Sequence, residues 1–194
     1  MGIFDKIFGK LVKSNDKEDN QDSKELDSSR FAKDLDYRFA QEFTRSGGLF
    51  NYCMDETEAL HTLKQIYQVE GLQSTYCPDE NLKNFLNVLN ISYSDKLDYE
   101  SDTAFITCEY LIAFNGKIML SNQNIEHYNA IQLPKNIIVM ATVSQIVSNF
   151  TDAMAKIKRQ KNAKNVTSLS GNKSDLEISD AHHNKKIFLL LLED

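Results

Sequence analysis

Two short stretches of this 194-residue chain carry side chains whose types and spacing suit chemistry on a ligand. The first is the loop 171–174, where Gly171, Asn172, Lys173 and Ser174 could offer backbone N–H groups and an ammonium group to an anion. Gly-Asn-Lys is also ordinary turn chemistry, and an unbroken apolar run follows shortly afterwards. The sequence therefore favours a plain turn before a last buried strand, with an anion-binding site as the alternative.

The second stretch is TCEYL, in which Glu109 stands among apolar residues. A carboxylate is costly to bury without a partner, so Glu109 could be a nucleophile, a general base, or simply a residue on the exposed side of a strand. The sequence favours the exposed position. Glu109 is nevertheless the one carboxylate that the sequence offers for catalysis at a strand end.

The cysteine and histidine residues do not indicate a metal site. Cys53, Cys77 and Cys108 are widely spaced and form no C-x-x-C pair, so they are typical of reduced cysteines in a core. His182 and His183 are adjacent, and adjacent side chains diverge in an extended chain. We expect neither a metal nor a cofactor.

Composition favours one folded domain that stays in the cytoplasm. Apolar residues make up 41% of the chain, which is enough for a core, and charged residues make up 26%. The net charge of -6 gives no basic footprint, so nucleic acid is not an expected partner. No apolar run is long enough to span a bilayer, and no secretory signal is visible.

The first 29 residues differ from the rest. Residues 1–13 place their apolar side chains on one helical face, which would suit a peripheral membrane contact, a partner, or docking on the chain's own domain. Residues 14–29 contain one apolar residue, Leu26, and predict a flexible polar tether. We therefore place the folded domain at 30–194.

Within that domain, helical and strand patterns alternate. Phe31, Leu35, Phe39 and Phe43 predict a helix that ends at the glycines of 46–48. Further helices are expected around 60–67, preceded by Asp55-Glu56, and from Pro78-Asp79 to Leu89. Six apolar runs predict strands: LFNYC, LQSTYC, NISYS, NIIVMA, NVTSLSG and KIFLLLLED.

The middle of the domain predicts a hairpin and one long helix. Asn115-Gly116 joins two apolar segments, which is a strong hairpin signal. Apolar residues from Val143 to Ile157 follow helical spacing. The expected fold class is α/β, a single domain with a mostly parallel sheet flanked by helices and one antiparallel hairpin. Ligands of such folds bind at the carboxyl ends of strands, where we expect 44–50, Glu109 and 170–177.

Three segments in order resemble the LUD domain, the LutC-like lactate-utilisation family. They are DTAFITCEYLIAFNGKIMLSN, LPKNIIVMATVSQIVSNFTDAMAKIK, and SLSGNKSDLE with the closing KKIFLLLLED. The resemblance covers about 45–194 and implies a NagB/RpiA/CoA-transferase-like fold. It also implies an accessory role beside partner subunits that carry iron–sulfur clusters. The family's GPSRTADIE loop has lost its proline and threonine here, and only Lys173 stands near the place of its arginine.

Three functions follow as hypotheses. The first is an accessory or regulatory protein of bacterial lactate utilisation, without robust catalysis of its own and with iron–sulfur oxidoreductase subunits as partners. The second is an enzyme of the CoA-transferase or sugar-phosphate-isomerase type that acts on an anionic small molecule. The third is a membrane-associated adaptor that works through residues 1–13.

Overall fold

The computed structural model describes residues 25–160, 163–171 and 185–194. The chain divides into two units, Met1–Asp34 and Leu35–Asp194, and the second is described below. Helix α2 (Glu25–Arg45) begins inside the stretch that the sequence predicts to be a tether. The amphipathic segment 1–13, with the membrane contact expected of it, lies outside the described residues.

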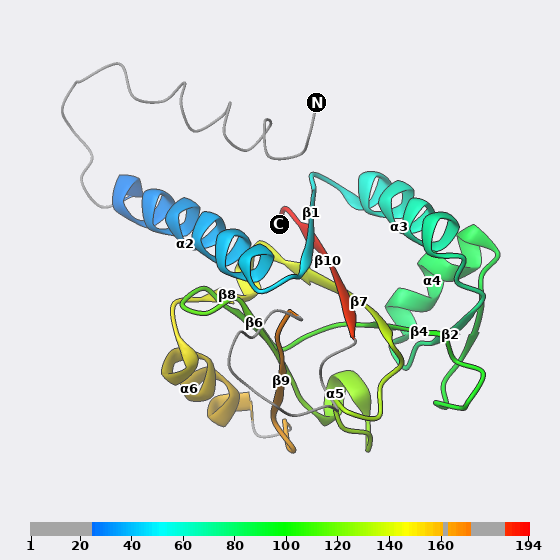
Figure 1. Cartoon of the computed structure of the whole chain (residues 1–194). Helices are drawn as coiled ribbons and strands as arrows, with labels where there is room; N and C mark the ends of the chain where they lie inside the picture. Colours follow the sequence, from blue (N-terminus) through cyan, green and yellow to red (C-terminus); the bar gives the residue numbers. More distant parts are fainter. Residues whose placement is uncertain (1–24, 161–162, 172–184) are drawn as a thin grey trace. The chain divides into compact units, whose positions relative to one another are not determined.

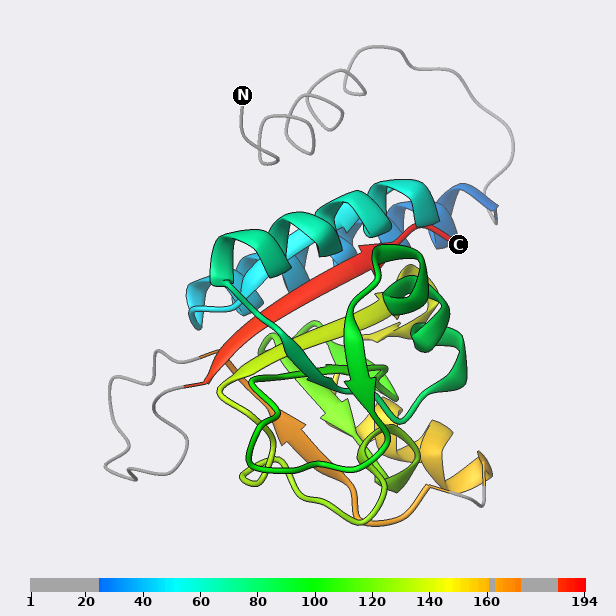
Figure 2. The ribbon, with the colours of Figure 1, turned by 90° about the vertical axis from the view of Figure 1, so that its right-hand side faces the viewer.

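A six-stranded sheet forms the centre of the second unit, and each of its neighbouring strands is parallel to the next. The strand order is β1-β10-β7-β4-β2-β3, and Figures 1 and 2 show β10 and β7 side by side. The expected α/β class with a mostly parallel sheet is confirmed. The strands are β1 (Leu49–Cys53), β2 (Ser74–Tyr76), β3 (Ser92–Ser94), β4 (Thr103–Ile106), β7 (Asn136–Thr142) and β10 (Lys186–Leu192).

Two helices, α3 (Glu56–Glu70) and α4 (Glu80–Leu89), cover one face of this sheet. Each begins at an aspartate, Asp55 or Asp79, whose side chain accepts hydrogen bonds from backbone N–H groups of the first turn. Both are expected from the sequence. Their apolar faces pack on the side chains of β10, β7 and β4 that point to this side.

The other face is covered by α2 and by a second, smaller sheet. Phe39 and Phe43 of α2 stack with ring centroids 5.6 Å apart, and both are fully buried. The four strands of the second sheet have the order β8-β5-β6-β9. They are β5 (Tyr110–Ile112), β6 (Lys117–Leu120), β8 (Ile146–Val147) and β9 (Thr167–Leu169). Helix α6 (Phe150–Gln160) packs on the far side of this sheet through Ala153 and Ile157.

The Asn115-Gly116 hairpin forms as expected, between β5 and β6, and belongs to the second sheet. Gly116 has a φ of 64°, in the left-handed region that glycine tolerates. A Cβ there would also lie 2.3 Å from the backbone nitrogen of Phe43. The turn therefore packs directly on the backbone of α2, which only glycine allows.

The long helix expected from Val143 to Ile157 is wrong in its first half. Residues Val143–Gln145 form a 3₁₀ turn, Ile146–Val147 form strand β8, and α6 begins only at Phe150. Asn149 starts α6, because its Oδ1 accepts a hydrogen bond from the N–H of Asp152 at 3.0 Å. The apolar spacing fits a helix, yet β-branched residues fit a strand as well once a neighbouring strand is available.

No helix among the described residues is long and apolar enough to cross a membrane.

Candidate functional site

The carboxyl ends of the parallel strands form the edge at which open α/β sheets bind ligands. Polar side chains follow all six of these strands in the structure. They are Asp55 after β1, Asp79 after β2, Asp95 after β3, Glu109 after β4, Gln145 after β7, and Glu193 and Asp194 after β10. Glu109 lies at this edge after β4, but it is half-buried and not on the exposed side of a strand, the position that the sequence favoured.

Glu109 lies in the bend between β4 and β5 and is half-buried. The hydroxyl of Ser121, which is fully buried, donates a hydrogen bond to Oε1 of Glu109. Ser121 begins the short helix α5 (Asn122–Ile125), and its Oγ accepts from the N–H of Gln123 at 3.0 Å. One carboxylate oxygen of Glu109 is therefore occupied by a hydroxyl that no ligand can reach.

Two amide side chains hold the bend that carries Glu109. Nε2 of Gln145 donates to the carbonyl of Cys108 at 2.6 Å, and its Oε1 accepts from the N–H of Thr142 at 2.8 Å. Nδ2 of Asn124 donates to Oγ1 of Thr107 at 3.1 Å. Neither residue is expected at the site from the sequence. The S-x-x-N pattern at 121–124 is a helix-start signal, whereas nothing local singles out Gln145.

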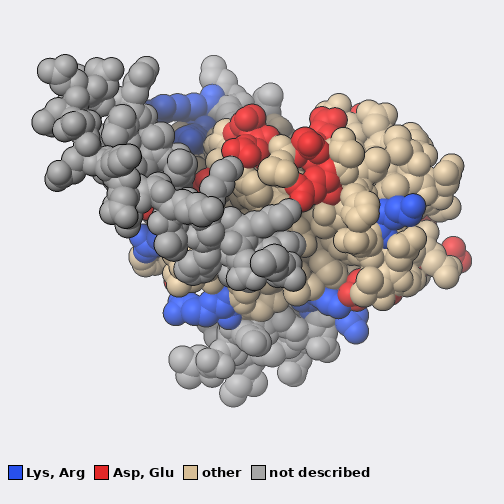
Figure 3. All heavy atoms as spheres, turned by 90° about the horizontal axis from the view of Figure 1, so that it is seen from above, with Lys and Arg blue, Asp and Glu red and all other residues tan. Residues whose placement is uncertain are grey.

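A group of carboxylates lies where β1 and β10 end. Figure 3 shows acidic side chains gathered on the face that is uppermost in Figure 1. Burial, together with the charges of Asp194 and Glu193, raises the pKa of Asp36 to about 6. Oδ2 of Asp194 accepts a hydrogen bond from the N–H of Ser144 at 2.6 Å, which ties the segment after β10 to the 3₁₀ turn that follows β7. This part of the edge favours cations over anions.

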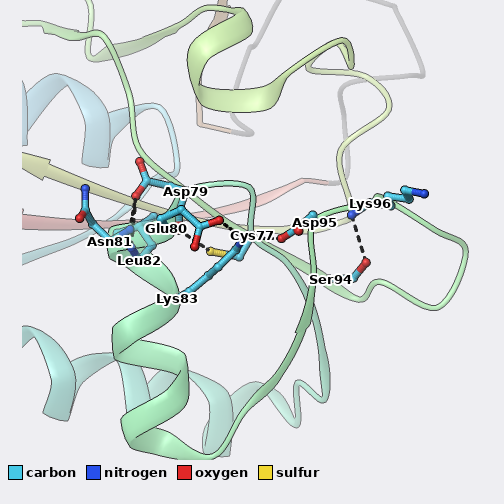
Figure 4. A network of polar contacts seen from close by, with 9 residues as sticks. All are labelled: Cys77, Asp79, Glu80, Asn81, Leu82, Lys83, Ser94, Asp95 and Lys96. Atoms are coloured by element: carbon cyan, nitrogen blue, oxygen red, sulfur yellow. Dashed lines mark hydrogen bonds and ion pairs between the residues drawn. The ribbon is translucent and has the colours of Figure 1, made fainter.

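At the other end of the edge, a polar network joins β2, β3 and α4 (Figure 4). The ammonium of Lys83, whose side chain is 9% exposed, lies 2.5 Å from Asp95 and 2.7 Å from Glu80. Hydrogen bonds to Asp95 and then Glu80 raise the pKa of Lys83 above its usual range. The one buried cation of this network is thus already paired twice.

Comparison with known proteins gives the family. A family model described as LUD domain matches residues 93–192, which is more than half of the 194 residues. The chain belongs to the LUD-domain family. The matched span includes Glu109, Ser121 and Gln145, so the polar bend described above is part of the LUD domain.

A solved structure supports the fold. The LUD-domain chain is similar to the crystal structure of a DUF162 family protein from Deinococcus radiodurans, with a TM-score of 0.63 and 14% sequence identity. The similarity covers 84% of this chain and 98% of that one, and at this identity it shows the fold alone. No curated protein matches the chain.

The cysteines of the LUD-domain protein are free and buried, as expected. Burial raises the pKa of the Cys53 thiol to about 11 and that of Cys77 to about 12. Burial also raises the pKa of Cys108, which adjoins Glu109. None of these thiols is poised as a nucleophile at neutral pH. Among the described residues, no group of acidic, histidine or cysteine side chains is arranged to hold a metal ion.

The glycines at 47–48 and Gly171, which the sequence places at the carboxyl edge, lie instead at the opposite edge of the main sheet. The glycines at 47–48 precede β1, and Gly171 lies against Ser46 and Gly48. A Cβ on Gly171 would lie 2.4 Å from the carbonyl oxygen of Ser46. Gly171 is therefore explained by close backbone packing.

The remaining residues of that predicted anion site, Asn172, Lys173 and Ser174, lie outside the described residues. The described chain resumes at Lys185, whose ammonium donates to the carbonyls of Leu133 and Pro134. Burial lowers the pKa of Lys185. The anion site stays a prediction.

Proposed function

We propose that this LUD-domain protein is an accessory or regulatory component of a bacterial lactate-utilisation system, without robust catalysis of its own. The observation that carries the proposal is the acidic carboxyl edge. Lactate, phosphates and acyl-CoA are all anions, and this edge presents Asp36, Glu193 and Asp194 to a ligand approaching the ends of β1 and β10. Like charges at the usual ligand-binding edge oppose such substrates.

The reactive groups near that edge support the same proposal. Glu109 has one oxygen engaged by buried Ser121, and the thiols of Cys53, Cys77 and Cys108 are buried with raised pKa values. A thiol in this state is protonated at neutral pH and is a poor nucleophile. These groups fit a structural role better than a catalytic one.

Thermal melting with anionic ligands tests the proposal. We expect lactate, phosphate, CoA and nucleotides at millimolar concentration to leave the melting temperature of the full chain unchanged. Lys173→Ala should behave in the same way and should change stability by under about 0.5 kcal/mol, as exposed surface changes do. A rise in melting temperature with one of these ligands that disappears in Lys173→Ala would contradict the proposal and establish the anion site.

The accessory role has its own assay. The tagged full chain should co-purify with iron–sulfur oxidoreductase subunits from cells grown on lactate, and lactate oxidation by the complex should exceed that of the subunits alone. The isolated chain should show no lactate oxidation. Equal activity of the oxidoreductase with and without this protein would count against an accessory role.

One observation favours a second function, that of an enzyme acting on an anionic small molecule. Glu109 stands directly after β4, at the strand end where catalytic groups of such folds lie, and it is half-buried. A carboxylate there could attack an acyl thioester or abstract a proton. Turnover of acyl-CoA thioesters or sugar phosphates that is lost in Glu109→Gln, with an unchanged melting temperature, would establish this alternative.

A further inference from the structure

A groove of about 350 Å³ lies beside Leu35 of α2 and along helix α6. Strand β8 runs between these two helices (Figure 1). Apolar lining comes from Leu35, Ile146, Val147 and Ala155. We call this surface the α2–α6 groove, and its lining includes none of the polar residues named at the carboxyl edge of the main sheet.

The α2–α6 groove is cationic in a chain whose net charge is -6. Lys156 and Arg159 are exposed, lie one turn apart on α6 and line the groove. Among the described residues, no ion pair engages either of them. The one acidic lining residue, Asp152, accepts a hydrogen bond from Nδ2 of Asn149 at 2.9 Å. In the sequence, every charged residue between 153 and 174 is Lys or Arg.

An exposed aromatic side chain flanks the groove. Phe114 is 62% exposed. The N–H of Phe114 donates to the carbonyl of Ser148 at 3.0 Å, and Ser148 itself lines the groove. The guanidinium of Arg38 lies 5.4 Å from the ring centroid of Phe114, which adds a further cation to this side. Exposed aromatic residues beside a groove are typical of protein-binding surfaces.

We infer that the α2–α6 groove binds an acidic segment of a partner protein, anchored by apolar side chains. The inference rests on the accessory function proposed above and assigns the surface through which it acts. The cations complement an acidic partner, and the apolar lining with Phe114 complements its apolar anchors. A nucleic acid fits less well, because the apolar lining offers nothing to a phosphate backbone.

Fluorescence anisotropy with a designed probe tests this inference on the full chain. The probe is a fluorescein-labelled 16-residue peptide with Leu and Phe at helical i, i+3, i+4 spacing and Asp or Glu elsewhere. Its twins carry Lys at every acidic position, or Ser at every apolar position. A labelled single-stranded RNA of similar length serves as the nucleic-acid probe. The protein variants are Arg159→Glu, Lys156→Glu with Arg159→Glu, and Phe114→Ser.

We expect the acidic apolar peptide to bind and both twins to bind at least about tenfold more weakly, a difference of about 1.4 kcal/mol. Each groove variant should weaken binding by a similar factor. Lys64→Glu is the matched control, because Lys64 is exposed on α3 and its substitution changes the charge by the same amount as Arg159→Glu. It should bind the peptide like wild type. Melting curves establish that each variant is folded. If the double variant does not fold, the single variant Arg159→Glu is enough for the test.

Three outcomes would overturn the inference: no binding of the acidic peptide at 1 mM, equal binding by the groove variants and Lys64→Glu, or preferential binding of RNA that the groove variants abolish. These outcomes are separate from a failure of the proposed function. The proposed function fails if an anionic small molecule raises the melting temperature, or if the oxidoreductase has the same activity with and without this protein. Neither result depends on the groove.

Discussion

Replacement of Asp36 by asparagine should stabilise the protein at neutral and alkaline pH. Asp36 lies on α2, and its carboxyl group is partly buried beside the chain-terminal Asp194 and Glu193. Burial first, and then these two negative charges, raise its pKa from the ordinary value of 3.8 to about 6. The charged form is thus unfavourable in the folded protein, and the neutral amide of Asn removes that penalty.

The size and pH dependence of the effect follow from linkage. At about 1.4 kcal/mol per pKa unit, the raised pKa corresponds to a loss of at most about 3 kcal/mol in the free energy of unfolding when Asp36 is charged. Screening by solvent at this partly exposed site reduces that loss to about 1–2 kcal/mol. Between about pH 4 and pH 6 the folded state keeps a proton that the unfolded state has lost. The wild type therefore loses this stability as the pH rises through that window, and the full penalty is present above it.

Urea denaturation and thermal melting at pH 8 and at pH 4 measure the effect. We expect the free energy of unfolding of Asp36→Asn to exceed that of wild type by about 1–2 kcal/mol at pH 8. For a domain of this size this corresponds to a melting temperature about 2–8 °C higher. The two proteins should agree at pH 4, where Asp36 is neutral. Asp34→Asn, at an exposed position of the same helix, is the control and should change little at either pH. A gain of equal size at both pH values would refute the electrostatic explanation.

Four other results are expected. Leu190→Ala should destabilise the protein by about 2–5 kcal/mol in urea denaturation, because Leu190 is fully buried in β10, and a loss below about 1 kcal/mol would contradict this. Gly171→Ala should cost about 1–3 kcal/mol, because its Cβ would meet the backbone of Ser46 at 2.4 Å; an unchanged unfolding midpoint would show that the loop can move aside. Deletion of 1–24 should leave the melting temperature within about 2 °C, whereas a larger drop would show that this segment packs on the domain. Elemental analysis of dialysed protein should find no stoichiometric zinc or iron, and one metal per chain would contradict the interpretation of the cysteines.

Some elements of this fold could be predicted locally. The stripe of Phe39 and Phe43, the aspartates before α3 and α4, and the Asn115-Gly116 turn each carry their structural signal within a few residues. The unbroken apolar run of β10 also predicted a strand covered on both faces. In the structure, Phe188 and Leu190 pack with α3 and α4, while Leu189 and Leu191 pack with the cluster of α2 and the second sheet.

The sequence by itself therefore determined the class of the domain, its helix starts and its hairpin, because these depend on side-chain type and local spacing. Only the tertiary structure decided which strands pair. Residues 146–147 became β8 because β5 offers a parallel partner, although their spacing suits a helix. Tertiary structure also brought Ser121 and Gln145 to Glu109 and Gly171 to Ser46, through contacts between residues far apart in the chain. Such contacts depend on how the layers pack, and no pattern within a single segment encodes them.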